Sequence, residues 1–128
     1  MPTGTPIPDD VRRFILTSIP SVPYLEALLL LRAEPAQPWD AATLARRLYL
    51  GEKQAAGLLQ QLHEAQLLEP AEEGGYRYRP VSDDLDAMVG RVALAYSSRL
   101  VEITNLIHSA TGKKAQHFAD AFLWRKDS

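Results

Sequence analysis

The chain has 128 residues, a length that fits one domain or one domain with helical extensions. It contains no cysteine, which excludes disulfides, thiolate metal sites and cysteine catalysis. The formal net charge is −2, so no general attraction to nucleic acid or anionic membranes is expected. No run approaches the ~18 consecutive apolar residues of a membrane span, and the start does not resemble a signal peptide. We therefore expect a cytoplasmic protein with no membrane partner.

The first third of the chain is predicted to be helical. Residues 1–20 are expected to form a loose arm and a short amphipathic helix that Pro20 ends. A second helix near 22–34 carries leucine on nearly every side, which is typical of a helix buried inside a domain. Pro35 ends this helix because proline cannot continue the backbone hydrogen bonds.

The next segment predicts two helices joined by a tight turn. Asp40 is a helix-capping residue, and the leucine spacing after it favours a helix over 41–48. Residues 49–51 form a three-residue break. A third helix over 52–65 has an apolar inner stripe, which indicates that it packs on the domain core.

A β-hairpin is predicted near 67–79. Gly74 and Gly75 supply turn positions that can take positive φ, and the alternating aromatic and charged residues after them are typical of a half-exposed strand. Trp39 could form a short strand of its own. Helix, turn, helix and hairpin occur in the order of a winged helix–turn–helix, so we assign this domain to residues 21–80. The predicted class is mainly α with a small β-hairpin wing.

Residues 81–128 are predicted to form dimerisation helices. A run from 83 to 107 contains no proline, and as one helix it would be about 40 Å long, longer than the domain is wide. A turn over 109–112 and a short helix over 113–127 would follow. An apolar stripe runs along the long helix, and such a helix needs a partner. The residues expected in the dimer interface are Leu85, Val89, Val92, Tyr96, Leu100, Ile103 and Leu106.

The sequence offers no recognisable active site. Its three histidines stand alone, without the i, i+4 pairing or neighbouring ligands of a metal site. The acidic clusters at 72–73 and 83–86 fall where a turn or a helix start favours acidic residues anyway. We therefore expect no enzyme, no metal and no cofactor.

Polar side chains on the helix–turn–helix and the wing could instead contact double-stranded DNA. Glutamine can pair with adenine and lysine with guanine, while arginine binds phosphate. The candidate DNA-binding residues are Arg46 and Arg47 on the second helix, Lys53, Gln54, Gln60 and Gln61 on the third, and Arg77 and Arg79 on the wing.

The charge of this region leaves a second interpretation open. Between Asp40 and Pro80, five basic residues stand against six acidic ones, a balance of −1, and the wing tip is acidic. These polar residues could equally be ordinary solvated side chains on amphipathic elements. The alternative function is a protein–protein adaptor that uses the third helix and the wing without binding DNA.

The segment "AATLARRLYLGEKQAAGLLQQLHEAQLLEP", residues 41–70, resembles the helix–turn–helix and first wing strand of bacterial winged-helix regulators. In that pattern Leu48 and Leu50 flank the turn, and Gln66 stands where glycine is usual. From "VRRFILTSIPSVPYLEALLLLR" to "FADAFLWRK", the chain also resembles small stand-alone bacterial winged-helix proteins of the MarR- and PadR-like superfamily. The resemblance implies a DNA-binding transcriptional regulator. The homodimer that the apolar stripe predicts would then act on a pseudo-palindromic site, because its two-fold symmetry requires two half-sites.

Overall fold

The computed structural model describes residues 7–110, and these group into two compact units. One unit is Pro23–Ala93, and the other combines residues 7–22 with residues 94–110. The short helix predicted over 113–127 lies outside the described residues. The turn predicted over 109–112 does not begin at its expected place, because residues 109 and 110 are helical.

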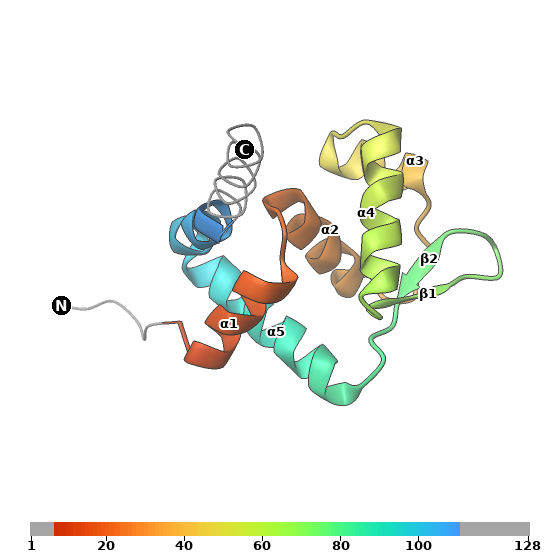
Figure 1. Ribbon diagram of the computed structural model, residues 1–128. Helices are drawn as coiled ribbons and strands as arrows, with labels where there is room; N and C mark the ends of the chain where they lie inside the picture. The colour runs from red at the N-terminus through yellow and green to blue at the C-terminus, as the bar shows by residue number, and fades with distance from the viewer. Residues whose placement is uncertain (1–6, 111–128) are drawn as a thin grey trace, which may run out of the picture. The chain divides into compact units, whose positions relative to one another are not determined.

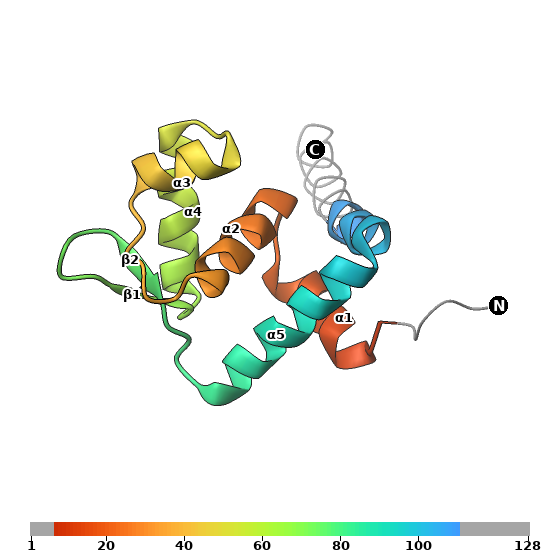
Figure 2. The ribbon, with the colours of Figure 1, turned by 180° about the vertical axis from the view of Figure 1, so that it is seen from behind.

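The Pro23–Ala93 unit has the winged helix–turn–helix order that the sequence predicts (Figure 1). It is mainly helical, with one two-stranded antiparallel hairpin. Its elements are α2 (Val22–Ala33), α3 (Ala41–Leu48), α4 (Glu52–Glu64), β1 (Leu68–Pro70), β2 (Tyr76–Tyr78) and the first part of α5 (Asp83–Ser98). Figure 2 shows α3 and α4 joined by their turn, with the hairpin beginning beside the C-terminal end of α4.

The start of α3 is fixed by the predicted cap. The Asp40 carboxylate accepts a hydrogen bond of 2.8 Å from the Thr43 backbone N–H. This bond satisfies one of the N–H groups that a helix start leaves without an internal partner. Backbone and side-chain hydrogen bonds from Thr43 hold the pKa of Asp40 below its usual value, so the cap remains charged at neutral pH.

Two helices end on residues other than glycine in the left-handed conformation. Tyr49 follows α3 with φ 56°, and Gln66 follows α4 with φ 65°. At the second site the Gln66 and Leu67 N–H groups donate to the carbonyls of His63 and Leu62, the hydrogen-bond pattern of a Schellman motif. A side chain in this conformation costs roughly 1–2 kcal/mol, a cost that glycine does not carry.

The wing is joined to the segment before α3 through Trp39. The Trp39 N–H donates to the Tyr76 carbonyl (2.7 Å), and the Tyr76 N–H donates to the Trp39 carbonyl (2.9 Å). Trp39 is fully buried, and the backbone of Gly75 passes directly against its carbonyl. The possible short strand at Trp39 is thus an isolated bridge to the hairpin.

The second unit contains α1 (Asp9–Ser18) and a helix over residues 100–110. The acidic pair Asp9 and Asp10 occupies the first turn of α1 and suits the positive end of the helix dipole. The buried apolar residues of this unit are Val11, Ile15, Ile19, Ile103 and Ile107.

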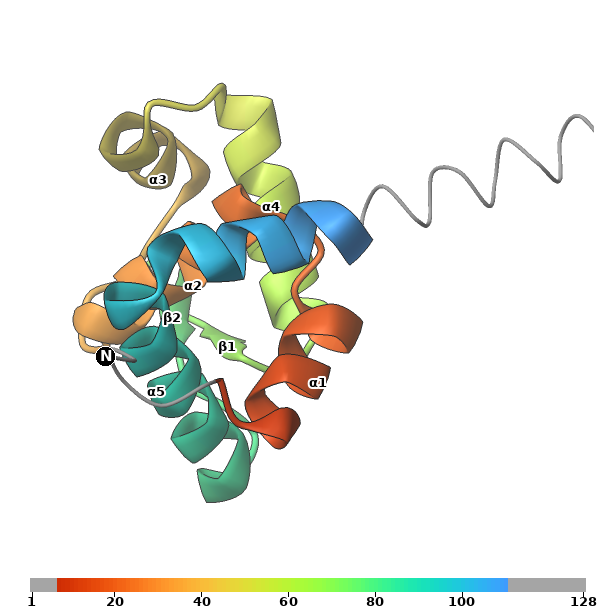
Figure 3. The same cartoon turned by 90° about the vertical axis from the view of Figure 1, so that its left-hand side faces the viewer.

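The prediction of one unbroken helix over 83–107 was wrong. α5 ends at Ser98, and helix resumes at residue 100 (Figure 3 shows the change of direction). The hydroxyls of Ser97 and Ser98 both donate to the Leu94 carbonyl at 2.9 Å. Serine back-bonding of this kind competes with the helical backbone and bends helices. The length argument for a dimer partner therefore no longer holds.

Alanine substitutions at Gly75 and Gly74 test whether the backbone of the wing lies directly against the Trp39 carbonyl. Both have positive φ, but a Cβ on Gly75 would overlap the Trp39 carbonyl, whereas a Cβ on Gly74 meets nothing within 4 Å. We expect Gly75→Ala to lower the free energy of unfolding by about 3 kcal/mol, from strain and overlap together. Gly74→Ala, the matched control, should lower it by about 1 kcal/mol. Equal losses in urea unfolding would contradict the close approach.

Candidate nucleic-acid interface

α4 presents one apolar and one polar face. Its buried residues are Ala55, Leu58, Leu59 and Leu62. Its exposed polar residues include the four predicted DNA contacts on this helix, Lys53, Gln54, Gln60 and Gln61. Of these, Gln60 donates a 3.1 Å hydrogen bond to Glu64, one turn further along. The fold thus brings the four predicted side chains to the solvent face of the helix.

The middle of this face is almost bare. Ala56 and Gly57 are exposed, and a Cβ on Gly57 would meet nothing within 4 Å. Glycine inside a helix costs about 1 kcal/mol relative to alanine, and no packing contact in the described residues requires it here. A partner can therefore approach the backbone of α4 closely at this point.

The two arginines of α3 differ in their surroundings. Arg47 forms a 3.2 Å ion pair with Glu34, and its guanidinium lies 5.3 Å from the centre of the Trp39 ring. Arg46 is exposed, and within residues 7–110 its side chain makes one long hydrogen bond, of 3.5 Å, to the Thr43 hydroxyl. Arg47 therefore takes part in packing around the wing joint, whereas Arg46 remains exposed on α3.

The cations beside the α3–α4 turn lack the acidic partners that Arg47, Arg77 and Arg79 have. Within residues 7–110, neither Arg46 nor Lys53 forms an ion pair. Both are exposed, one in the last turn of α3 and the other in the first turn of α4. Glu52, also exposed in that first turn, offsets part of this charge.

The two wing arginines are engaged with acidic neighbours. Arg77 donates to the Ala36 carbonyl (2.9 Å) and pairs with Glu73 (2.6 Å), which leaves its side chain only 30% exposed. The pKa of Glu73 is lowered by its own backbone N–H and by Arg77. Arg79, 73% exposed, pairs more loosely with Glu69 at 3.6 Å. Much of the positive charge predicted for the wing is therefore neutralised within the chain.

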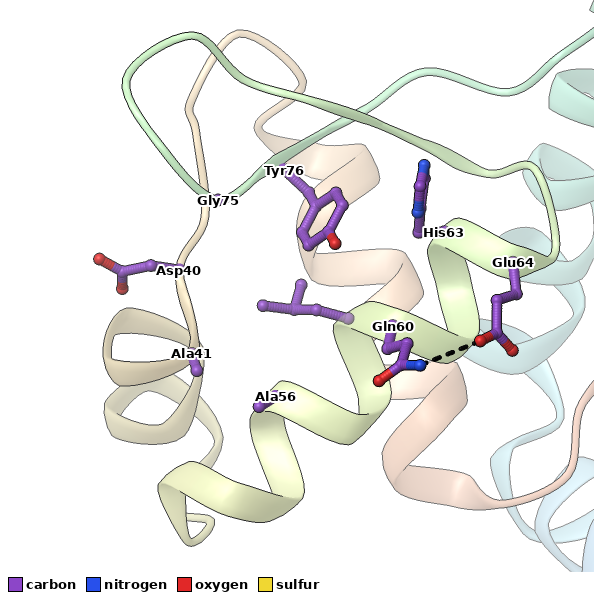
Figure 4. Close-up of a pocket in the computed structure, with 9 residues that line it drawn as sticks. Asp40, Ala41, Ala56, Gln60, His63, Glu64, Gly75 and Tyr76 are labelled. Atoms are coloured by element: carbon purple, nitrogen blue, oxygen red, sulfur yellow. Dashed lines mark hydrogen bonds between the residues drawn. The ribbon is translucent and has the colours of Figure 1, made fainter.

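A hollow of about 550 Å³ lies between α4, the start of α3 and the wing. The His63 and Tyr76 rings stand 5.0 Å apart on one side, and the linked pair Gln60 and Glu64 lies on another (Figure 4). Asp40 also borders the hollow, but its side chain points away from it. No lysine or arginine is among the lining residues, so the hollow does not attract phosphate.

This hollow was not predicted from the sequence, because the three histidines were considered only as metal ligands, for which they stand alone. The sequence did contain one signal for it. His63 lies one helical turn from Gln60, so both share a face of the third helix, and the predicted hairpin directly follows that helix. The His63 ring packs on the Tyr76 ring. Spacing alone could not name Tyr76 as the partner, because the register of the hairpin decides which residue reaches His63.

At the base of the wing, β2 is joined to α5. The Tyr78 hydroxyl donates a 2.6 Å hydrogen bond to the Asp86 carboxylate, which lies 3.9 Å from Arg32. Burial, and then the hydrogen bond to Asp86, raise the pKa of the Tyr78 phenol above its usual value. This contact lies within the Pro23–Ala93 unit and holds one end of the hairpin.

The predicted dimer residues divide by exposure within the single chain. Val89, Val92 and Ile103 are fully buried, so they are core residues and not free surface. Leu85, Tyr96 and Leu106 are half-buried, and Leu100 is exposed. The apolar residues most exposed in the second unit are Leu94 (71%), Val101 (70%) and Leu100 (53%).

A metal centre and a single membrane-spanning helix are both absent from residues 7–110. No group of three or more His, Asp or Glu side chains there could hold a metal ion. No single helix in that range is long and apolar enough to cross a membrane. Taken together, α1 and α2 are long and apolar enough for a membrane span, although the chain bends between them by 111°. This is weak evidence for a span, because the buried core helix of a globular domain has the same length and composition.

Comparison with known proteins adds little to the geometry. No family model and no curated protein matches the chain. It is similar to a solved structure described as a possible transcriptional regulator from Methanosarcina mazei Go1. The two are 21% identical, with a TM-score of 0.46, over 73% of this chain and 82% of the other.

The Tyr78–Asp86 contact should be visible as a pH dependence of stability. Because the pKa of Tyr78 is raised in the folded state, its contribution is complete below about pH 10, the ordinary tyrosine value, and is lost as the pH rises further. Tyr78→Phe removes the titrating group, so urea unfolding between pH 8 and 11 should show a shallower alkaline loss than the wild type. Parallel curves would contradict this role.

Proposed function

We propose that the chain is a cytoplasmic DNA-binding regulator that reads DNA with α4. One observation carries the proposal: Arg46 and Lys53, the exposed cations of the Pro23–Ala93 unit that form no ion pair in residues 7–110, flank the α3–α4 turn. In a helix–turn–helix this turn and the start of the second helix lie closest to the DNA. Cations placed there can bind phosphate and release its counterions.

Base reading would be done by the exposed side chains of α4. Gln54 and Gln61 can pair with adenine in the major groove, beside the phosphate contact of Lys53. The bare stretch at Ala56 and Gly57 would let the helix approach the bases closely. Gln60 is already bonded to Glu64, and Arg77 is held by Glu73 and Ala36, so both contribute less than the sequence suggests.

A homodimer on a pseudo-palindromic site completes the proposal. The exposed apolar residues Leu94, Leu100 and Val101 are suited to a contact between two copies. A two-fold dimer would place its half-sites about one helical turn apart, or a multiple of that distance. Two cations from each of two protomers would neutralise about four phosphates, which predicts a shallow log–log salt slope of about −4.

The DNA proposal is tested by selecting duplexes from a random pool and titrating the preferred one in a gel shift. Lys53→Ala should weaken binding about tenfold and flatten the salt slope by about one unit per protomer. Glu52→Gln should strengthen binding, because it removes the acidic side chain beside Lys53. If the wild type binds no duplex even at low salt, the proposal fails.

The wing offers a matched control for that gain of affinity. Glu72→Gln removes the same charge from the exposed wing tip, away from the α3–α4 turn, at a residue for which no ion pair is found in residues 7–110. If the turn carries the contact, Glu72→Gln should change the affinity much less than Glu52→Gln does. An equal or larger gain at the wing would move the DNA contact to the hairpin.

The dimer surface is tested by substitutions that the fold tolerates. Val101→Glu changes an exposed residue and should give folded monomers, as judged by light scattering and circular dichroism. Ile103→Glu places a charge at a fully buried position and should unfold the protein, so it is no test of assembly. A folded Val101→Glu dimer would exclude this surface.

A protein-docking function is the second candidate, and the hollow beside α4 favours it. The hollow is suited to a basic side chain from a protein partner. It offers the His63–Tyr76 ring pair and the Glu64 carboxylate, and no lysine or arginine lines it. His63→Ala should then abolish partner binding, while it should leave DNA binding through Lys53 intact. Lys53→Ala should do the reverse, so His63→Ala and Lys53→Ala together distinguish DNA binding from protein docking.

A further inference from the structure

Tyr49 is the most exposed large apolar or aromatic residue described, and its backbone is strained. Its side chain is 95% exposed at the turn between α3 and α4. Its φ of 56° and ψ of 45° place it in the left-handed region, which residues other than glycine, asparagine and aspartate rarely occupy. An aromatic side chain is thus presented to solvent from a backbone position that favours glycine.

Within residues 7–110, no contact accounts for the tyrosine side chain. The backbone bonds at this helix end run from the Tyr49 and Leu50 N–H groups to the Ala45 carbonyl. Glycine would make the same bonds without the strain, as in the common helix ending. A side chain this exposed also buries almost no apolar surface to offset its unfavourable backbone. Backbone strain that the fold does not repay is a signature of functional positions.

The neighbours of Tyr49 indicate what it contacts. Arg46 stands three residues before it and Lys53 four residues after it, and these are the exposed cations of the unit that form no ion pair in residues 7–110. A phenol O–H is a hydrogen-bond donor of the kind that binds phosphate oxygens in protein–DNA complexes. The turn therefore carries one neutral donor between two cations.

We propose that Tyr49 binds a phosphate of the DNA backbone, its O–H donating to a phosphate oxygen between Arg46 and Lys53. This inference rests on the proposed function and adds a specific positioning contact to it. A phosphate contact fixes the register of α4 on the duplex and carries no sequence preference. Tyr49 therefore contributes equally to the preferred duplex and to unrelated ones.

The test uses two substitutions that relieve the same backbone strain at different places. Tyr49→Gly and Gln66→Gly each put glycine at a left-handed helix end. Both should raise Tm, by about 3–5 °C. Only Tyr49→Gly should also weaken binding, roughly tenfold on preferred and unrelated duplexes alike. Gln66→Gly should bind as the wild type does.

Tyr49→Phe separates the hydroxyl from the ring. It keeps the ring and the backbone conformation but loses the donor, so it should bind nearly as weakly as Tyr49→Gly without the rise in Tm. Full affinity in Tyr49→Phe, or wild-type affinity in Tyr49→Gly, would overturn the phosphate contact while the DNA function stands. A wild type that binds no duplex would overturn both.

Discussion

Two backbone hydrogen bonds between Trp39 and Tyr76 join the wing to the helix–turn–helix, and the arrangement of the candidate surface depends on them. They fix where β2 lies relative to the segment that enters α3. Gly75 makes this possible, because any side chain there would overlap the Trp39 carbonyl. Because Trp39 is completely buried, the joint is part of the core.

This joint also determines which cations remain available to a partner. Holding the hairpin in place brings Arg77 to the Ala36 carbonyl and Glu73, and Arg47 over the Trp39 ring. These arginines stabilise the wing and are not free to bind phosphate. Arg46 and Lys53, at the opposite end of α4 from the joint, stay exposed. A near-neutral domain can in this way keep a local positive charge at its helix–turn–helix.

Features with a local cause could be predicted from the sequence. The Asp40 cap, the bounds of α3 and the glycine turn of the wing all follow from neighbouring residues. The break at Arg99 was missed because two serine hydroxyls turn back on the Leu94 carbonyl in a run with no proline. The pairing of Arg77 with the distant Ala36 carbonyl and the hollow at His63 depend on tertiary register, which spacing alone does not give.

The central claim is that the α3–α4 turn and the outer face of α4 contact DNA. Its most direct test is a titration of the ¹⁵N-labelled protein with a selected duplex, followed by amide chemical shifts. We expect the largest changes in amide chemical shift between Arg46 and Gln61, and only small changes at Glu72 on the wing tip. Shifts concentrated around His63 and Tyr76, with none at Lys53, would contradict it.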